Sequence, residues 1–251
     1  MGIIIIKAGL LDTIQDLGRP SHQHEGINPG GAMDTYSMKV ANILAGNDPA
    51  EAVIEMHFPA SAYLFTQPAI IALAGADFSA SINGEAVPHL HPILVNRNDV
   101  LQFHQPLEGA RCYLAVKGGF VTDEWLGSRS THLKAGIGGF EGRKLQKNDE
   151  LMIRQTSFAF QLNESGYRVL PWRAQIKWQE DINGLLVITG HEWDRLTQEG
   201  KENFSMTSFV VTRQSDRMGY RLNNLPLPVL THEEVLSSAV SFGTVQLLPD
   251  G

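Results

Sequence analysis

The sequence contains a single cysteine, Cys112, in 251 residues. One thiol excludes an internal disulfide framework and a cysteine-based zinc cluster. No apolar run approaches the ~20 residues that a membrane-spanning helix requires. The chain opens with only four consecutive isoleucines before Lys7 and lacks a small-residue cleavage pattern, so we expect no signal peptide. These absences predict a soluble, cytoplasmic protein that does not bind a membrane.

Positive charge is also scarce. Lys and Arg number 20 against 27 Asp and Glu, which gives a net charge of −7. Nucleic-acid-binding proteins normally carry a basic excess, so this class is disfavoured. Two phosphate-binding motifs are missing as well: no Gly-Lys-Ser/Thr follows a glycine loop, and Glu141 stands where the dinucleotide fingerprint begun by Gly136 needs glycine.

Short runs of β-branched or aromatic residues, bounded by Gly, Pro, Asn or Asp, dominate the chain. Asn83 and Gly84 both accept positive φ and predict a type I′ hairpin turn. The 24 glycines and 12 prolines fit many tight turns. We therefore predict a mainly β protein of the barrel or sandwich kind with few short helices. The predicted strands cover residues 3–6, 70–73, 93–95, 100–103, 112–116, 151–153, 185–189 and 209–212.

Helical patterns are few. Apolar residues recur at helical spacing over residues 33–44, where Asp34 or the preceding glycines can begin a helix and Gly46 can end it. A second helix is predicted from residue 192 to about residue 203, and a short helical turn over residues 122–126.

A polar segment with little periodicity, residues 156–179, divides the chain into unequal parts. We predict an N-terminal lobe over residues 1–155, a linker over residues 156–179 and a C-terminal lobe over residues 180–251. A short internal similarity supports this division, because the segments around Asp16 and Asp216 both follow an apolar run and place an aspartate before a glycine.

The first candidate site lies near the N-terminus. Backbone N–H groups of Gly30 and Gly31, before a helix, can bind an anion, and Arg19 can hold a carboxylate or phosphate through two hydrogen bonds. Asp16 or Asp34 can act as a base or orient one. The same residues are more commonly structural, since aspartate often caps a helix and an Asp–Arg pair stabilises a turn.

Three further segments carry candidate residues. Asp77 ends an apolar strand beside small residues, which suits either a substrate site or a turn. The loops between Lys117 and Arg143 are rich in glycine, hydroxyls and cations, and form either an anion pocket or an ordered surface loop. Asp216 and Arg217 can bind an acidic group or form a surface ion pair.

The histidine pairs at residues 22 and 24 and at residues 89 and 91 would share a strand face and could hold a metal. No third ligand stands at a suitable spacing, so we expect no metal site. Cys112 lies in an apolar strand and is predicted to be an unreactive core residue.

Six segments in this order resemble a known family: TIQDLGRP, GAMDTYSMKVANILAGN, AGAD, YLAVKGG, LGSRSTHLKAGIGGFEGR and QSDRMGYRL. They are similar to the KipA-like proteins, also described as biotin-dependent carboxyltransferase-like or allophanate-hydrolase-subunit-2-like. The resemblance runs from about Gly9 to Gly251 and implies two cyclophilin-like β-barrel lobes. Family members usually continue beyond the final segment SSAVSFGTVQLLPDG, so the resemblance also implies that the second lobe is partial.

A well-defined bacterial branch of this family is the C-type subunit of an ATP-dependent 5-oxoprolinase, which opens 5-oxo-L-proline to L-glutamate with ATP hydrolysis. The resemblance therefore implies a hydrolase acting on a cyclic amide, with ATP as co-substrate of the complex. The implied partners are a KipI-like B-type subunit, a LamB/YcsF-type partner that forms the A-type subunit, and the small lactam substrate. No lysine stands in the biotin-acceptor context AMKM, so we expect no covalently attached biotin.

Under this interpretation the candidate catalytic residues are Asp16, Arg19, Asp34 and Asp77. The candidate substrate- or anion-binding residues are Gln15, Gly30, Gly31, Lys117, Ser128, Arg129, Ser130, Gly138, Gly139, Arg143, Asp216 and Arg217. Two alternatives stay open. One is the carboxyltransferase component of a urea-amidolyase-type biotin system, and the other is a non-catalytic KipA-type regulator, or scaffold, that binds a KipI-like protein.

Overall fold

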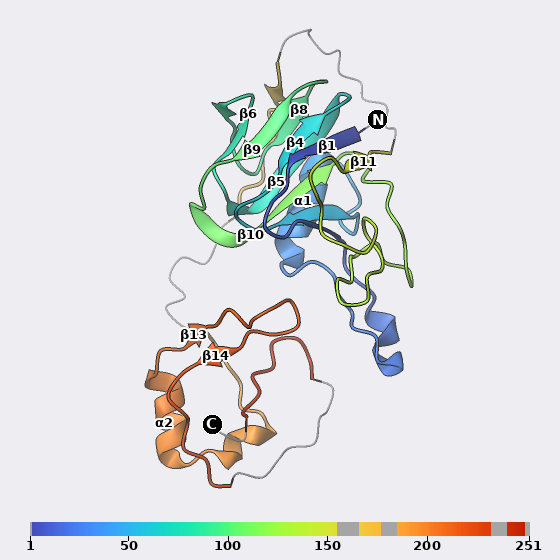
Figure 1. Ribbon diagram of the computed structural model, residues 1–251. Coiled ribbons are helices and arrows are strands. Elements are labelled where there is room, and N and C mark those ends of the chain that lie inside the picture. The colour runs from blue at the N-terminus through green and yellow to red at the C-terminus, as the bar shows by residue number, and fades with distance from the viewer. Residues whose placement is uncertain (1, 155–165, 177–184, 232–239, 249–251) are drawn as a thin grey trace. The chain divides into compact units, whose positions relative to one another are not determined.

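The computed structural model describes residues 2–154, 166–176, 185–231 and 240–248 (Figure 1). The chain forms two compact units, Met1–Ile176 and Lys177–Gly251. Residues 156–165 and 177–179 of the expected linker lie outside the described residues. The first unit holds two six-stranded antiparallel sheets. No helix in the described ranges is long and apolar enough to cross a membrane.

The first sheet has the strand order β11-β1-β4-β9-β6-β7. Its strands are β1 (Gly2–Lys7), β4 (Ala62–Phe65), β6 (Ala80–Ile82), β7 (Glu85–Ala86), β9 (Val100–Phe103) and β11 (Glu150–Met152). The second sheet has the order β12-β8-β5-β10-β3-β2. Its strands are β2 (Thr13–Gln15), β3 (Val53–Met56), β5 (Ala69–Asp77), β8 (Pro92–Val95), β10 (Glu108–Val116) and β12 (Arg168–Val169).

The main core lies between the two sheets, because side chains of β1 and β4 cluster there with those of β3, β5 and β10. Alternation along β5 explains how the second sheet is buried on both faces. Ile71 and Leu73 join this core, whereas Ala72 and Ala74 belong to a second cluster on the opposite face. That second cluster contains the buried side of helix α1 (Thr35–Ala45). The small alanines on this face allow the helix to approach the sheet closely.

Helix α1 confirms the helix expected over residues 33–44. Asp34 is its N-cap and accepts a hydrogen bond from the backbone N–H of Ser37 at 3.0 Å. Gly46 ends the helix in the left-handed conformation, with φ of 77°, where glycine has no Cβ to clash. The hairpin turn is also confirmed, because Asn83 and Gly84 join β6 to β7 with φ values of 53° and 87°.

The prediction of a short helical turn over residues 122–126 is wrong. Trp125 and Ser128 instead face each other in an isolated antiparallel bridge. Leu126 and Gly127 between them have φ values of 51° and 73°, which a right-handed helix does not permit. Neither sheet closes into the expected β-barrel, since no ladder joins the two sheets among the described strands.

The second unit contains a 3₁₀ helix η2 (His191–Arg195), helix α2 (Gln198–Met206) and the paired strands β13 (Val210–Val211) and β14 (Leu222–Asn223). The prediction of a single continuous helix over residues 192–203 is therefore wrong, because the helix is interrupted near the middle of this range. Thr197 has extended backbone and caps a new helix by accepting from the N–H of Gly200 at 3.0 Å. The strand expected over residues 185–189 is also wrong, because this segment is exposed and has no ladder partner among the described strands.

Candidate functional site

The carboxylate of Asp16 is the centre of a buried polar network at the end of β2. Its Oδ1 accepts hydrogen bonds from the backbone N–H of Gly18 at 2.7 Å, from Ser128 Oγ at 2.7 Å and from Ser130 Oγ at 2.5 Å. Its Oδ2 accepts from the backbone N–H of Arg129 at 2.6 Å. Asp16 is 8% exposed. A carboxylate offers about four acceptor positions, and these four donors make use of that capacity.

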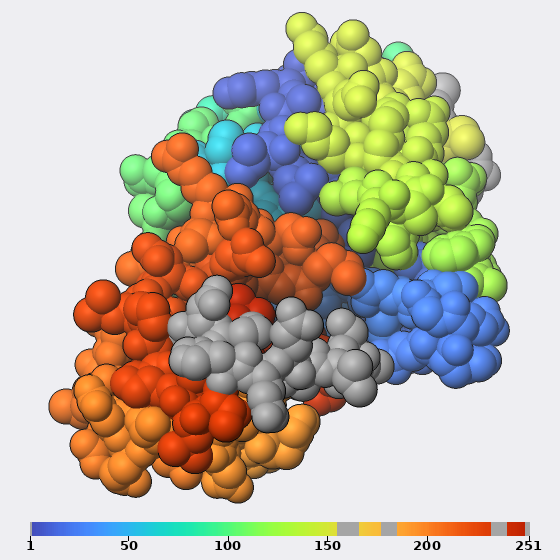
Figure 2. Space-filling model, turned by 60° about the horizontal axis from the view of Figure 1, so that its bottom comes forward, coloured from blue at the N-terminus to red at the C-terminus, as the bar shows by residue number. Residues whose placement is uncertain are grey.

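The backbone of Asp16 fixes two more loops. Its N–H donates to Ser130 Oγ at 2.9 Å, and its carbonyl accepts from the N–H of Ala32 at 2.8 Å. The backbone of Thr131 adds a bond to the carbonyl of Ile14 at 2.9 Å. Asp16 therefore holds the loop of residues 127–131 and the glycine turn at residues 30–31 against the end of β2. Figure 2 shows the lime-coloured segment near residues 130–145 bordering the blue N-terminal segment on one face.

Arg19 is buried beside this network, with 2% of its surface exposed. Its Nη2 donates to the carbonyl of Ser130 at 2.6 Å and its Nε to the carbonyl of Trp125 at 3.4 Å. The guanidinium lies over the Trp125 ring, 4.9 Å from the centroid. Burial lowers the pKa of Arg19, and the charge of Asp16 opposes that shift. Its Nη1 has no hydrogen-bond partner among the described residues.

The glycines around Arg19 make room for its guanidinium. Gly30 has φ of 63°, and a Cβ there would lie 3.1 Å from Arg19 Nη1. A Cβ on Gly138 would meet the carbonyl of Ser130 at 2.5 Å and Arg19 Nη2 at 3.4 Å. Gly139 is packed against Thr131 in the same loop region. The structure thus brings the predicted glycines of both segments to Arg19 and its neighbours.

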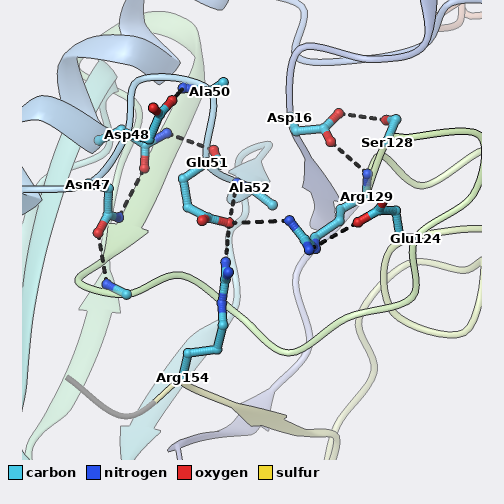
Figure 3. A network of polar contacts seen from close by, with 12 residues as sticks. Asp16, Asn47, Asp48, Ala50, Glu51, Ala52, Glu124, Ser128, Arg129 and Arg154 are labelled. Carbon is cyan, nitrogen blue, oxygen red and sulfur yellow. Dashed lines mark hydrogen bonds and ion pairs between the residues drawn. The ribbon is translucent and has the colours of Figure 1, made fainter.

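Arg129 links the Asp16 network to a second set of charges (Figure 3). Its guanidinium pairs with Glu124 at 3.0 Å and lies 3.9 Å from Glu51. Glu51 is also paired with Arg154 and accepts from the N–H of Ala52 at 2.9 Å. Acidic partners already neutralise the Arg129 side chain. Arg129 therefore takes part in the Asp16 network through its backbone N–H.

Asp34 lies at the start of α1, where its oxygens accept from the N–H and the hydroxyl of Ser37 at 3.0 and 2.5 Å. These bonds give it the capping role that the sequence offered as the alternative to catalysis. Nearby, the buried Glu55 carboxylate accepts from Tyr113 Oη at 2.9 Å and from the N–H of Met33 at 2.8 Å. Burial raises the pKa of Tyr113, and the Glu55 charge adds to the rise.

Several predicted residues lie outside this cluster. Asp77 closes a turn by accepting from the N–H of Ser79 at 2.8 Å. Arg143 forms paired bonds to Asp149 at 2.7 and 2.9 Å and contacts Glu141, so its charge is already satisfied. Lys117 lies near the C-terminal end of α1, with its Nζ 3.8 Å from the position of a Cβ on Gly46.

Asp216 and Arg217 belong to the second unit. Asp216 accepts from the N–H groups of Met218 and Gly219 at 2.7 and 3.2 Å in an exposed turn. Arg217 is half-buried. Both residues lie in the second unit, where the hydrogen bonds accepted by Asp216 stabilise the local turn.

Sequence reasoning missed three contributors to the first-unit site. Trp125 lies within the predicted helical turn, yet its ring and carbonyl both contact Arg19. Glu55 and Tyr113 carry no motif, although a carboxylate inside the apolar run of β3 is a signal that could have found Glu55. Gln15, which was predicted, is fully buried with its Oε1 unpartnered among the described residues, while its Nε2 donates to Thr13 Oγ1 at 3.0 Å.

In the described ranges no group of three or more His, Cys, Asp or Glu side chains is placed to hold a metal ion. His22 and His24 do not share a strand face, because they lie in the 3₁₀ helix η1 (Pro20–Glu25). Cys112 is 1% exposed, and burial raises the pKa of its thiol, which confirms it as a core residue.

Residues 25–251 match the family described as the carboxyltransferase domain, subdomain A and B. The chain belongs to this carboxyltransferase domain family. It is 34% identical to the C subunit of 5-oxoprolinase from Escherichia coli (strain K12) over 247 residues, which cover 98% of this chain and 76% of that protein. It is 32% identical to the corresponding 5-oxoprolinase subunit from Haemophilus influenzae over 239 residues, covering 95% and 74%.

The chain also resembles parts of larger proteins. The urea amidolyase of Lachancea kluyveri is 36% identical over 156 residues, which are 62% of this chain and 8% of that protein. The crystal structure of the K. lactis urea amidolyase matches with a TM-score of 0.74 and 26% identity, over 92% of this chain and 14% of that one. The crystal structure of TTHA0988 matches with a TM-score of 0.76 and 28% identity, over 100% and 47%.

Proposed function

We propose that this chain is the C-type subunit of an ATP-dependent 5-oxoprolinase that opens 5-oxo-L-proline to L-glutamate. The observation that carries the proposal is the similarity to the Escherichia coli 5-oxoprolinase subunit over 98% of this chain. The urea amidolyase of Lachancea kluyveri matches over only 62% of this chain. The proposed partners are a KipI-like B-type subunit and a LamB/YcsF-type partner that forms the A-type subunit.

The chemistry of the reaction determines which groups such a site must supply. An unstrained lactam is a poor electrophile, and transfer of the γ-phosphoryl group of ATP to its carbonyl oxygen would activate it. Water then attacks the carbonyl carbon, the ring C–N bond breaks as the nitrogen takes a proton, and a second water releases the phosphate. The protein must hold anionic groups throughout, and donors fixed in advance do so without reorganisation.

The residues around Asp16 fit a binding and positioning role. Arg19 brings a buried positive charge, and the surrounding loops are held in place by the Asp16 network. Asp16 is assigned the role of a positioning residue rather than a base, because four hydrogen bonds already occupy its oxygens. ATP is proposed as co-substrate of the complex, and no covalent biotin is proposed on this chain.

The first test is reconstitution. The chain is co-expressed with B-type and A-type subunits, and glutamate release from 5-oxo-L-proline is measured with and without ATP. We expect ATP-dependent turnover that disappears when this chain is omitted. A stable complex without turnover would contradict the hydrolase and favour the regulatory alternative. Turnover of urea that depends on a biotin-carrying protein would favour the carboxyltransferase alternative, which the similarity to urea amidolyases supports.

A further inference from the structure

In the part of the chain that the structure describes, the positive charge of Arg19 has no ion-pair partner. Among the described residues no carboxylate oxygen lies within 4.0 Å of its guanidinium, whereas Arg129, Arg143 and Arg154 each form such pairs. Asp16 is the acidic neighbour, but both of its oxygens accept from other donors. Arg19 is only 2% exposed, and the charge of Asp16 acts on its buried guanidinium without forming a direct ion pair among the described residues.

This arrangement is costly for the fold. An isolated buried charge is strongly disfavoured, and arginine retains its proton under all ordinary conditions. The chain nevertheless holds the guanidinium firmly, with a bond from Nη2 to Ser130, a bond from Nε to Trp125, and the Trp125 ring against its face. A guanidinium that is fixed at two nitrogens and unpartnered at the third is arranged to receive an anion from outside the chain.

The unpartnered nitrogen is itself buried, and a glycine of the surface lies beside it. Gly30 is exposed, and a Cβ on it would lie 3.1 Å from Nη1. Apart from Gly30 and its two neighbours in the chain, the next nearest atom to that position is the Ser130 Cβ at 4.0 Å. A side chain at position 30 would therefore be directed at Nη1, and glycine leaves that position empty. Its left-handed backbone, with φ of 63°, and that of Gly31, with φ of 92°, shape the turn at this point.

We propose that Arg19 Nη1 binds the carboxylate of a small ligand that approaches over Gly30. The choice of 5-oxo-L-proline as that ligand rests on the proposed function. A carboxylate carries one negative charge and matches the one guanidinium. A phosphate dianion would need further cationic donors, and Arg129 in the adjoining loop is already paired with Glu124. The inference assigns Arg19 to the part of the substrate that does not react.

The test measures binding to the full chain, in the complex with its B-type and A-type subunits where that complex forms, by titration calorimetry. Three probes are compared: 5-oxo-L-proline, 2-pyrrolidinone, which is the same lactam ring without the carboxylate, and inorganic phosphate. We expect 5-oxo-L-proline to bind, and 2-pyrrolidinone to bind about tenfold or more weakly because it lacks the charge-assisted hydrogen bond.

Two glycine substitutions make the test specific for Nη1. Gly30→Ala places a methyl group over Nη1, and we expect it to weaken 5-oxo-L-proline binding about tenfold or more. Gly26→Ala is the matched control, because Gly26 also has a positive φ, 77°, but a Cβ there meets nothing within 4 Å. We expect Gly26→Ala to leave binding unchanged, and circular dichroism and urea unfolding establish that both variants are folded.

Each result has a separate meaning. Equal affinity for 5-oxo-L-proline and 2-pyrrolidinone, tighter binding of phosphate, or equal effects of Gly30→Ala and Gly26→Ala would overturn the carboxylate site. ATP-dependent turnover with an unchanged KM in Gly30→Ala would overturn the site while the proposed function stands. Carboxylate-dependent binding that Gly30→Ala abolishes, without any turnover in the reconstituted complex, would support the site and contradict the proposed function.

Discussion

At the scale of single residues, Asp16 determines how the candidate site is held together. Asp16→Asn replaces one acceptor oxygen by an NH₂ group that faces existing donors. We expect the free energy of unfolding to fall by about 2–4 kcal/mol, because the loss of one member of a buried, charged hydrogen-bond network leaves its partners unsatisfied. Urea unfolding of the purified chain measures the change.

Asp48→Asn is the matched control for this substitution. Asp48 also accepts from a backbone N–H, that of Ala50 at 2.8 Å, but in an exposed turn. We expect a change of less than about 1 kcal/mol there, because water can replace the lost bond. Equal losses at the two positions would show that the Asp16 network does not hold the loops in place.

Asp149 gives a pH-dependent prediction at the same scale. Burial raises the pKa of Asp149, but hydrogen bonds from Arg143 and from the N–H of Gln146 outweigh it, so the pKa is lowered from 3.8. A lowered native pKa means that the carboxylate contributes stability above pH 3.8, and that this contribution is lost as the pH falls through the native value. Arg143→Gln removes the main stabilising partner.

We therefore expect Arg143→Gln to be less stable than the unaltered chain at pH 7, and the difference to shrink as the pH falls below about 3.8. Thermal unfolding of the two chains between pH 7 and pH 3 provides the comparison. A stability difference that stays constant over this range would contradict the role of the Arg143–Asp149 pair.

At the scale of elements, the structure gives Asp34 the capping role, and a pair of substitutions tests it. Asp34→Ala removes the acceptor for Ser37, and we expect α1 to lose about 1 kcal/mol of stability. Asp34→Asn keeps a capping oxygen, so we expect stability within a few tenths of a kcal/mol of the original. Turnover of the reconstituted complex should survive Asp34→Asn. Its loss in a stably folded Asp34→Asn variant would restore Asp34 as a catalytic residue.

Elements with a strong local signal could be predicted from the sequence. Helix α1 has both its periodic residues and its caps in one continuous segment, and the hairpin at Asn83 depends on two adjacent residues. Strands β5 and β10 follow from long apolar runs. Strand β2 escapes prediction because it is three residues long and contains Gln15, whose burial depends on partners far along the chain.

The arrangement of the site could not be predicted from local sequence patterns, because it also depends on contacts between distant residues. The glycines, Asp16 and Arg19 were identified by residue type, but the contact between Asp16 and Ser128 joins positions 112 residues apart. No periodicity encodes such a contact. Local context also could not show that Arg143 is satisfied by Asp149 while Arg19 is left without a carboxylate partner among the described residues, since both arginines stand in similar glycine-containing segments.

At the scale of the whole molecule, the two units differ in how much they bury. Both large clusters of buried apolar side chains lie within Met1–Ile176. In the described part of the second unit only Leu196 and Leu227 are buried apolar side chains, whereas Leu186, Ile188 and Phe242 are at least 91% exposed. Burial of apolar surface is the main favourable contribution to folding, so the first unit is predicted to be stable by itself.

A fragment of residues 1–176 tests this prediction. We expect it to unfold cooperatively in urea and to keep dispersed amide signals in NMR spectra, because it retains both clusters and every element around Asp16 and Arg19. A fragment of residues 1–167 serves as the control. It lacks β12, which pairs with β8, and Leu170, which packs against Ile70 and Leu94. Removing a buried leucine costs about 2–5 kcal/mol, so the shorter fragment should unfold at a lower urea concentration. If residues 1–176 failed to fold cooperatively, the second unit would have to supply stability that its own described packing does not show.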